Sequence, residues 1–174
     1  AVGKVLSAKA HPTAEHLLVE QIDVGEAAPR QVVSGIAAHY KPDDMAGRLV
    51  LVVMNLKPSK FRGELSQGMV MCATNRDESS SEERVELVEA PSDAAPGERV
   101  VLRAAGGGDV DAASTTVPDK VIDPKKKNSI WPSVAPNFKT NAERTVMFGD
   151  AHEFVTERSN GACTVPTLAS RPVS

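Results

Sequence analysis

Three cationic side chains lie close together in one short segment of the chain, at Lys57, Lys60 and Arg62. Pro58 and the glycines that follow are expected to hold the backbone of this segment out of regular structure. Neutral donors and acceptors accompany the cations, at Asn55, Ser66 and Gln67. Cations mixed with hydrogen-bonding side chains match the phosphate backbone of a nucleic acid. On composition alone, an ordinary solvated loop with three charges explains the segment equally well.

Two apolar runs enclose this segment and predict strands that fix both of its ends. Leu49–Met54 is uniformly apolar, which places it in the middle of the core, and Met69–Ala73 is a second buried strand. Other short strand-like runs alternate with turn residues, and a short helix is expected at 41–46. These runs are Val2–Ala10, Leu17–Val24, Arg30–Ile36, Val85–Leu87 and Arg99–Leu102. The pattern predicts a mainly β protein, and a small closed barrel removes the exposed edges of such short strands.

The last third of the chain has a different composition. Gly106–Gly108 predicts a flexible joint, because three consecutive glycines restrain the backbone least. After Pro118 the strand patterns are weaker, and the apolar bulk comes from Trp131 and three phenylalanines. So few large apolar side chains make a marginal core, so this part is expected to pack on the barrel.

The residues that commonly carry catalysis do not form a recognisable site. The chain has no Gly-x-Ser-x-Gly motif, and Cys72 lies in an apolar run where its thiol stays protonated. The histidines show no metal-ligand spacing with the two cysteines; these residues are His11, His16, His39, His152, Cys72 and Cys163. We therefore expect neither an enzyme nor a cofactor or metal in this part of the protein.

Composition and charge are those of a globular domain. The 174 residues are 41% hydrophobic and 25% charged, with a formal net charge of −3. Acidic residues concentrate at 77–98 and leave the remainder net basic, so a polyanionic partner is not excluded. No apolar run approaches the ~20 residues of a membrane-spanning helix, and the two cysteines fit a reducing, cytoplasmic setting. Because the chain begins inside an apparent strand, we expect a piece of a longer protein.

Longer motifs occur in one order along nearly the whole chain. They are His11-Pro12, Asp23-Val24-Gly25-Glu26, Pro29-Arg30, the run Asn55–Met69, and Pro96-Gly97-Glu98-Arg99. This series resembles the tRNA-binding domain of the endothelial monocyte-activating polypeptide family, which is also appended to some methionyl- and tyrosyl-tRNA synthetases. Past the glycines, the motifs Asp123–Lys127, Trp131 and Gly161-x-Cys163 resemble the additional C-terminal domain of that family.

The resemblance implies an oligonucleotide-binding (OB) fold, a five-stranded Greek-key barrel, followed by a small domain. It divides the chain into a barrel at 1–106, a joint at 107–117 and a C-terminal domain at 118–174. It also implies that the C-terminal domain packs on the barrel as a second subunit does in bacterial dimers of the family. The module is therefore expected to be monomeric.

Motif positions in the family imply which residues contact tRNA. The expected contacts are Asn55, Lys57, Lys60, Arg62, Ser66, Gln67 and Met69, with a second set at Lys125, Lys126 and Lys127. An acidic, serine-rich insertion at Asp77–Glu83 departs from the family pattern, and its charge would repel RNA near the barrel mouth.

Physical reasoning favours a folded RNA over a single strand as the ligand. The barrel half offers only Tyr40 and Phe61 for stacking, so a broad platform for bases is absent and backbone and shape must dominate. We therefore expect non-catalytic, largely sequence-tolerant tRNA binding that assists an aminoacyl-tRNA synthetase in cis or in trans. The alternative is a protein-interaction scaffold of a multi-synthetase complex or a cytokine-like fragment. The latter is weakened because Ala1–Ser7 lacks the leading arginine of the family's cytokine segment.

Overall fold

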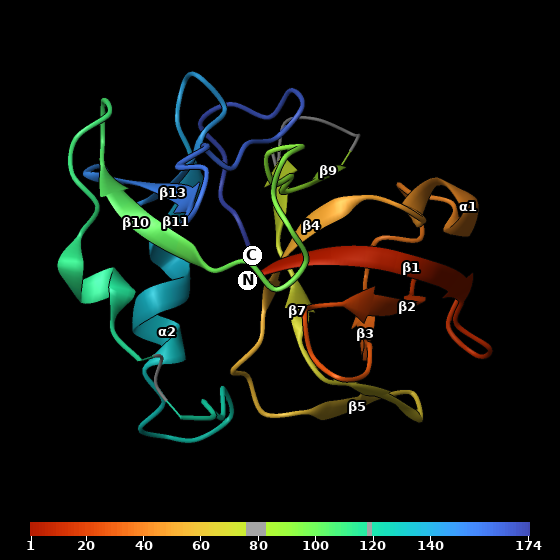
Figure 1. The fold of residues 1–174 in the computed structure, drawn as a ribbon. Coiled ribbons are helices and arrows are strands. Elements are labelled where there is room, and N and C mark those ends of the chain that lie inside the picture. Colours follow the sequence, from red (N-terminus) through yellow and green to blue (C-terminus); the bar gives the residue numbers. More distant parts are fainter. Residues whose placement is uncertain (76–82, 118–119) are drawn as a thin grey trace.

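The computed structural model describes residues 1–75, 83–117 and 120–174, and its first half is a closed β-barrel (Figure 1). Five antiparallel strands pair in the order β3-β2-β1-β4-β7. Their bounds are β1 (Val2–Ala10), β2 (Leu18–Asp23), β3 (Arg30–Ser34), β4 (Leu49–Val53) and β7 (Met69–Val70). A register shift between Val5 and Ser7 gives β1 the extra bend that lets it pair with both β4 and β2.

The barrel closes between β3 and residues Ser66 and Gln67, which lead into β7. The backbone N–H of Gln67 donates to the Gln31 carbonyl at 2.8 Å, and the Gln31 N–H donates to Gln67 Oε1 at 3.1 Å. The Val33 N–H completes the seam by donating to Ser66 Oγ at 3.0 Å. This closed five-stranded arrangement confirms the predicted OB fold and mainly β class.

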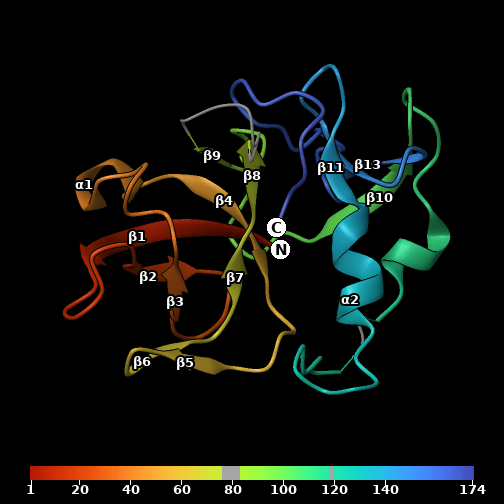
Figure 2. The same cartoon turned by 180° about the vertical axis from the view of Figure 1, so that it is seen from behind.

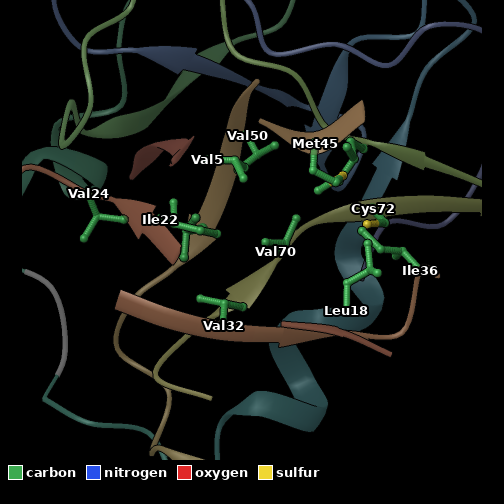
Figure 3. Close-up of a cluster of buried hydrophobic side chains, with 12 residues drawn as sticks. Val5, Leu18, Ile22, Val24, Val32, Ile36, Met45, Val50, Val70 and Cys72 are labelled. Carbon is green, nitrogen blue, oxygen red and sulfur yellow. The ribbon is translucent and has the colours of Figure 1, made fainter. Parts of the chain in front are cut away.

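Aliphatic side chains fill the barrel interior (Figure 3). Leu18 and Ile22 lie on the same face of β2 and are almost completely buried, because that face of the strand points into the core. The four-residue helix α1 (Pro42–Met45) closes one end of the interior with Met45. At Gly3 the strands approach so closely that an added Cβ would lie 2.6 Å from Ile22, so a larger residue does not fit there.

Between β4 and β7 the chain forms a two-stranded hairpin. Its strands are β5 (Ser59–Phe61) and β6 (Glu64–Ser66). This differs from the expectation of irregular backbone, because Pro58 lies just before β5 and therefore removes no N–H from the hairpin. Arg62 and Gly63 form the two-residue turn with positive φ angles of 48° and 102°, as a type I′ turn requires.

The C-terminal part is an open antiparallel sheet in the order β10-β13-β12-β11. Its strands are β10 (Val100–Ala104), β13 (His152–Thr156), β12 (Val146–Phe148) and β11 (Phe138–Thr140). A further two-stranded sheet joins the two parts, formed by β8 (Cys72–Asn75) and β9 (Arg84–Leu87). Short helices complete the part, namely α2 (Trp131–Val134) and the 3-10 turns η1 (Ala112–Thr115) and η2 (Ala135–Asn137).

The C-terminal sheet packs on the barrel through a shared core, as the sequence predicts. Leu51 and Met71 from the barrel side join Phe138, Phe154 and other buried residues of the C-terminal part in one cluster. The chain end also pairs with β8, because Ser174 and Cys72 exchange backbone hydrogen bonds of 2.7 and 2.9 Å. The two termini accordingly lie side by side in both views (Figures 1 and 2).

Backbone pairings surround the predicted boundary at residue 106 and the predicted joint at 107–117. β10, assigned to the barrel domain, pairs with β13 of the C-terminal sheet from Val100 to Ala104. The glycines form a turn that returns along β10, where the Ala104 N–H donates to the Asp109 carbonyl at 2.9 Å. Arg99 donates to the carbonyls of the following segment, at Ser114, Thr115 and Thr116, so this region is held in place by hydrogen bonds.

Two further observations complete the description of the fold. Most of the expected acidic insertion, residues 76–82, lies outside the described residues. In the described ranges, no helix is long and apolar enough to span a membrane.

Candidate nucleic-acid interface

The β5–β6 hairpin presents two of the predicted cations to solvent. Lys60 and Arg62 are both exposed, the first on β5 and the second in the turn. Across the hairpin Lys60 pairs with Leu65, and Phe61 pairs with Glu64. The barrel holds the hairpin from the side, because Gln31 Nε2 donates to the Leu65 carbonyl at 2.9 Å and to Glu64 Oε2 at 3.0 Å.

A backbone bridge brings the second predicted set of cations to the first. The Lys57 N–H donates to the Ile122 carbonyl at 2.8 Å, and the Ile122 N–H donates to the Asn55 carbonyl at 2.7 Å. Leu56 and Ile122 thereby form a parallel β-bridge between segments far apart in sequence. Both views show the hairpin and the chain after residue 120 at the same edge of the molecule (Figures 1 and 2).

Lys125, Lys126 and Lys127 are exposed and begin three residues after this bridge. We call these three lysines together with Lys57, Lys60 and Arg62 the cationic surface. Its parts come from two regions that the sequence separates by more than fifty residues, and the Leu56–Ile122 bridge joins them.

One carboxylate lies within the cationic surface. Lys57 Nζ donates to Asp123 Oδ2 at 2.9 Å, and the Lys125 N–H donates to Asp123 Oδ1 at 3.1 Å. The hydrogen bond from Lys57 is the main cause that lowers the pKa of Asp123, followed by the bond from Lys125. Asp123 therefore stays ionised and partly neutralises the charge of Lys57.

The neutral residues predicted to contact RNA take part in hydrogen bonds or strand pairing of the fold itself. Ser66 is 3% exposed, and its hydroxyl accepts from the Val33 N–H and donates to the Gly68 carbonyl. Gln67 closes the barrel seam against Gln31. Met69 of β7 is half-buried and pairs with Val53 of β4. Asn55 is half-buried and supplies its carbonyl to the Ile122 bridge. The structure thus exposes the predicted cations and buries Ser66.

Arg30 fixes both ends of the segment that carries the cations, a role that sequence reasoning missed. Its Nη1 donates to the Met54 carbonyl at 2.7 Å and to the Gln67 carbonyl at 2.9 Å. The Glu26 carboxylate accepts from Nη2 and Nε of Arg30 at 2.6 and 2.8 Å. This hydrogen bonding is the main cause that raises the pKa of Arg30. The only local signal was the spacing of Glu26 and Arg30, since Met54 and Gln67 are distant in sequence.

His11 holds the tip of the hairpin and is itself 5% exposed. Its Nδ1 accepts from the Thr13 N–H at 3.1 Å, which assigns the ring proton to Nε2. Nε2 then donates to the Phe61 carbonyl at 3.0 Å. The His11-Pro12 motif therefore has a structural role next to the cations.

No group of three or more metal-ligating side chains occurs among the residues that the structure describes. Cys72 and Cys163 are free and buried, and burial raises the pKa of each thiol to about 12. Both thiols are therefore protonated at neutral pH, as the sequence predicts for Cys72.

Comparison with known proteins places these features in a family. Residues 1–99 match the family described as "Putative tRNA binding domain". The chain is 41% identical over 170 residues to aminoacyl tRNA synthase complex-interacting multifunctional protein 1 of Cricetulus griseus, covering 97% of this chain and 42% of that protein. It is 46% identical over 142 residues to the cytoplasmic methionine–tRNA ligase of Caenorhabditis elegans, covering 82% of this chain and 14% of the ligase.

Among solved structures, the C-terminal domain of Plasmodium vivax p43 superimposes with a TM-score of 0.81 at 28% identity. That match covers 99% of this chain and 94% of the p43 domain, so it includes the C-terminal sheet as well as the barrel. The chain spans less than half the length of the two full-length relatives named above. The match over residues 1–99 and the identity to synthetase-associated relatives confirm the predicted resemblance, and the chain belongs to the tRNA-binding domain family.

Proposed function

We propose that the chain binds tRNA through the cationic surface, without catalysing a reaction, and assists an aminoacyl-tRNA synthetase in cis or in trans. The observation that supports this most is the Leu56–Ile122 bridge, because it joins two sets of exposed cations at one edge of the fold. Cations held at fixed spacing on a rigid β scaffold suit the phosphates of a folded RNA.

The binding is proposed to be largely tolerant of tRNA sequence. Lysine and arginine contacts to phosphate fix the position of an RNA but carry no base information directly. Ser66 and Gln67, uncharged side chains with the polar groups needed to read bases, make hydrogen bonds inside the barrel seam instead. Affinity is therefore expected to depend strongly on salt, with a log–log slope of roughly −0.7 to −0.9 per phosphate contact.

The test is tRNA binding at several salt concentrations with a triple variant, Lys57→Ala, Lys60→Ala and Arg62→Ala. Loss of three contacts is expected to reduce the magnitude of the slope by about 2 to 3 and the affinity about 100-fold at 0.1 M salt. A second triple variant, Lys4→Ala, Lys41→Ala and Arg84→Ala, is the matched control, because it removes the same charge from exposed positions on other elements.

The control variant is expected to bind tRNA nearly as the wild-type protein does. Equal losses in both triple variants would mean that total charge, and not the cationic surface, determines binding. Wild-type binding that does not change with salt would also contradict the proposal.

Setting and assembly follow from the same proposal. Relatives named as cytoplasmic tRNA ligases and as a synthetase-complex protein support a cytoplasmic setting with a synthetase as partner. The shared core supports a monomeric module, because the C-terminal sheet already covers Leu51 and Met71 on the barrel. Sedimentation of the protein would test the monomeric state.

A second candidate function, protein interaction with a synthetase, is favoured by exposed apolar side chains in the C-terminal part. Val117 is 90% exposed, Val121 65% and Ile130 46%. Substituting Val121→Ser and Ile130→Ser, which adds no charge near the cationic surface, should weaken binding to a purified synthetase and spare tRNA binding if this function is correct. Unchanged synthetase binding would reject these residues as the contact.

A further inference from the structure

Phe61 is an exposed aromatic residue that lies between two cations in the sequence. The residue is 44% exposed, and its sequence neighbours Lys60 and Arg62 are exposed as well. The other phenylalanines and Trp131 pack in the shared core, and the Tyr40 hydroxyl accepts from the Leu87 N–H at 3.0 Å. Phe61 is therefore the aromatic ring that the molecule offers to a ligand.

The backbone that carries the Phe61 ring is held from three directions. Its carbonyl accepts from His11 Nε2 at 3.0 Å, and Phe61 pairs with Glu64 across the hairpin. The adjacent turn residues, Arg62 and Gly63, complete the tight connection. A ring on such a fixed backbone loses little conformational freedom on binding, so less of the binding free energy is spent on ordering it.

The turn next to Phe61 has a residue that local backbone preference does not favour. A type I′ turn prefers Asn or Gly at its first position, because the residue there needs a positive φ, and Arg62 has a φ of 48°. Such a conformation is strained for a non-glycine residue. A cation is thus placed beside the exposed ring at some cost in stability.

From these observations we propose a subsite for one unpaired nucleobase on Phe61, which rests on the proposed tRNA binding. The base stacks on the ring, and a phosphate of its nucleotide contacts Arg62 in the adjacent turn. The partner is RNA and not an apolar protein surface, because the ring lies on the hairpin that carries the exposed cations Lys60 and Arg62, and these complement phosphate. Only an RNA with an unstacked base, in a loop or at a single-stranded end, fills the subsite.

The subsite predicts discrimination between folded tRNA and a blunt RNA duplex of similar length. Phe61→Leu keeps apolar bulk but removes the aromatic face, so tRNA affinity should fall roughly 5- to 100-fold. The salt slope should stay the same because no charge is lost, and duplex affinity should not change. Leu6→Ala is the matched control, because Leu6 is an exposed apolar residue on β1 at 49% exposure.

A fluorescence experiment reads the stacking directly. Phe61→Trp in a Trp131→Phe background puts the single tryptophan at the hairpin. We expect this variant to keep the wild-type tRNA affinity, and its fluorescence should be quenched by tRNA but not by the blunt duplex.

Each outcome has a distinct meaning. Salt-dependent tRNA binding that Phe61→Leu leaves unchanged rejects the subsite and keeps the proposed function. Equal losses for tRNA and duplex mean that Phe61 supports the hairpin or a general apolar contact, which also rejects the subsite. A wild-type protein that binds neither RNA rejects the proposed function itself.

Discussion

The barrel and the C-terminal sheet differ in how each completes its own structure. The barrel closes its hydrogen-bond ladder at the Gln31–Gln67 seam and fills its interior with aliphatic side chains. The C-terminal sheet stays open, and its aromatic core around Phe138 and Phe154 is completed by Leu51 and Met71. Lys60 and Arg62 are therefore held on a hairpin that the barrel fixes, whereas Lys125–Lys127 follow a segment that is joined to the barrel by the Ile122 bridge and the Lys57–Asp123 ion pair.

The largest expected effect concerns a titratable carboxyl group buried inside the barrel. Glu20 is fully buried, accepts from Ser34 Oγ at 2.9 Å, and its Oε1 has no hydrogen-bond partner among the described residues. Burial raises the pKa of Glu20 from the ordinary 4.5 to about 8. Between these values the folded protein holds a proton that the unfolded chain has released. The stability that Glu20 contributes is therefore full below pH 4.5 and is lost as the pH rises to about 8.

Glu20→Gln should remove this pH dependence. The stability difference between wild type and variant should change by about 4 kcal/mol from acid to alkaline pH, in favour of the variant at high pH. Urea unfolding of both proteins at pH 5, 7 and 9 measures it. Parallel pH curves would show that Glu20 does not titrate as a buried group.

The next prediction separates the stability of the two regions. Phe138→Ala removes a ring that is 8% exposed and that packs against Phe154 at a centroid distance of 5.6 Å. The cost is expected to be roughly 3–5 kcal/mol and confined to the C-terminal sheet. Amide hydrogen exchange should lose protection in β10–β13 and keep it in β1–β4. Equal loss in the barrel strands would mean that the barrel also depends on the shared core.

The two sets of cations should differ in their effect on tRNA binding. Replacing Lys125, Lys126 and Lys127 by Ala removes the same charge as the hairpin triple variant. We expect this variant to lose tRNA affinity about 10-fold, whereas the variant of Lys57, Lys60 and Arg62 should lose about 100-fold. The loss is smaller because fewer phosphate contacts form where the backbone is less restrained. Filter binding of tRNA to both variants at one salt concentration compares them. A larger effect of the lysine run would reverse the assignment.

A smaller effect is expected at Asp123, which shares Lys57 with the ligand. Asp123→Asn removes a negative charge from the cationic surface and releases Lys57 from a 2.9 Å ion pair. The tRNA affinity should rise about 3-fold, and the salt slope should become steeper by less than 1. Reduced affinity would instead show that Asp123 orients Lys57 for binding.

The smallest expected effect tests the turn. Arg62→Asn places a favoured residue at the positive φ of 48° and should raise the stability by about 0.5 kcal/mol. The same change removes a cation, so tRNA affinity should fall several-fold. Thermal unfolding and tRNA binding of one variant measure both effects. A variant that is destabilised would contradict the strain assigned to Arg62.

The sequence predicted the local elements well, because turn residues and apolar runs mark strand ends directly. Val2–Ala10 is β1 as expected, and α1 begins at Pro42 inside the expected range. The expected strand Met69–Ala73 is divided between β7 and β8, which pair with different partners. The β5–β6 hairpin differs from the predicted irregular backbone, because Pro58 lies before β5 and leaves the N–H groups of the hairpin intact.

The exposure of the predicted cations follows from their residue types, whereas the assembly of the proposed cationic surface does not. The cations at Lys57, Lys60 and Arg62 are exposed as their charge requires, whereas the burial of Ser66 depends on a hydrogen bond from Val33. The bridge to Ile122 and the role of Arg30 depend on contacts between residues far apart in the chain. No local pattern encodes such contacts, so they required the structure.

The most direct test of the account is a tRNA titration followed by amide NMR of the intact protein. The account predicts that amides of residues 55–65 and 122–127 shift together and saturate at the same tRNA concentration. Amides of β11 and β12, which lie in the C-terminal sheet, should not shift. Shifts in only one of the two segments, or shifts centred on the C-terminal sheet, would contradict a single RNA-binding surface joined at the Leu56–Ile122 bridge.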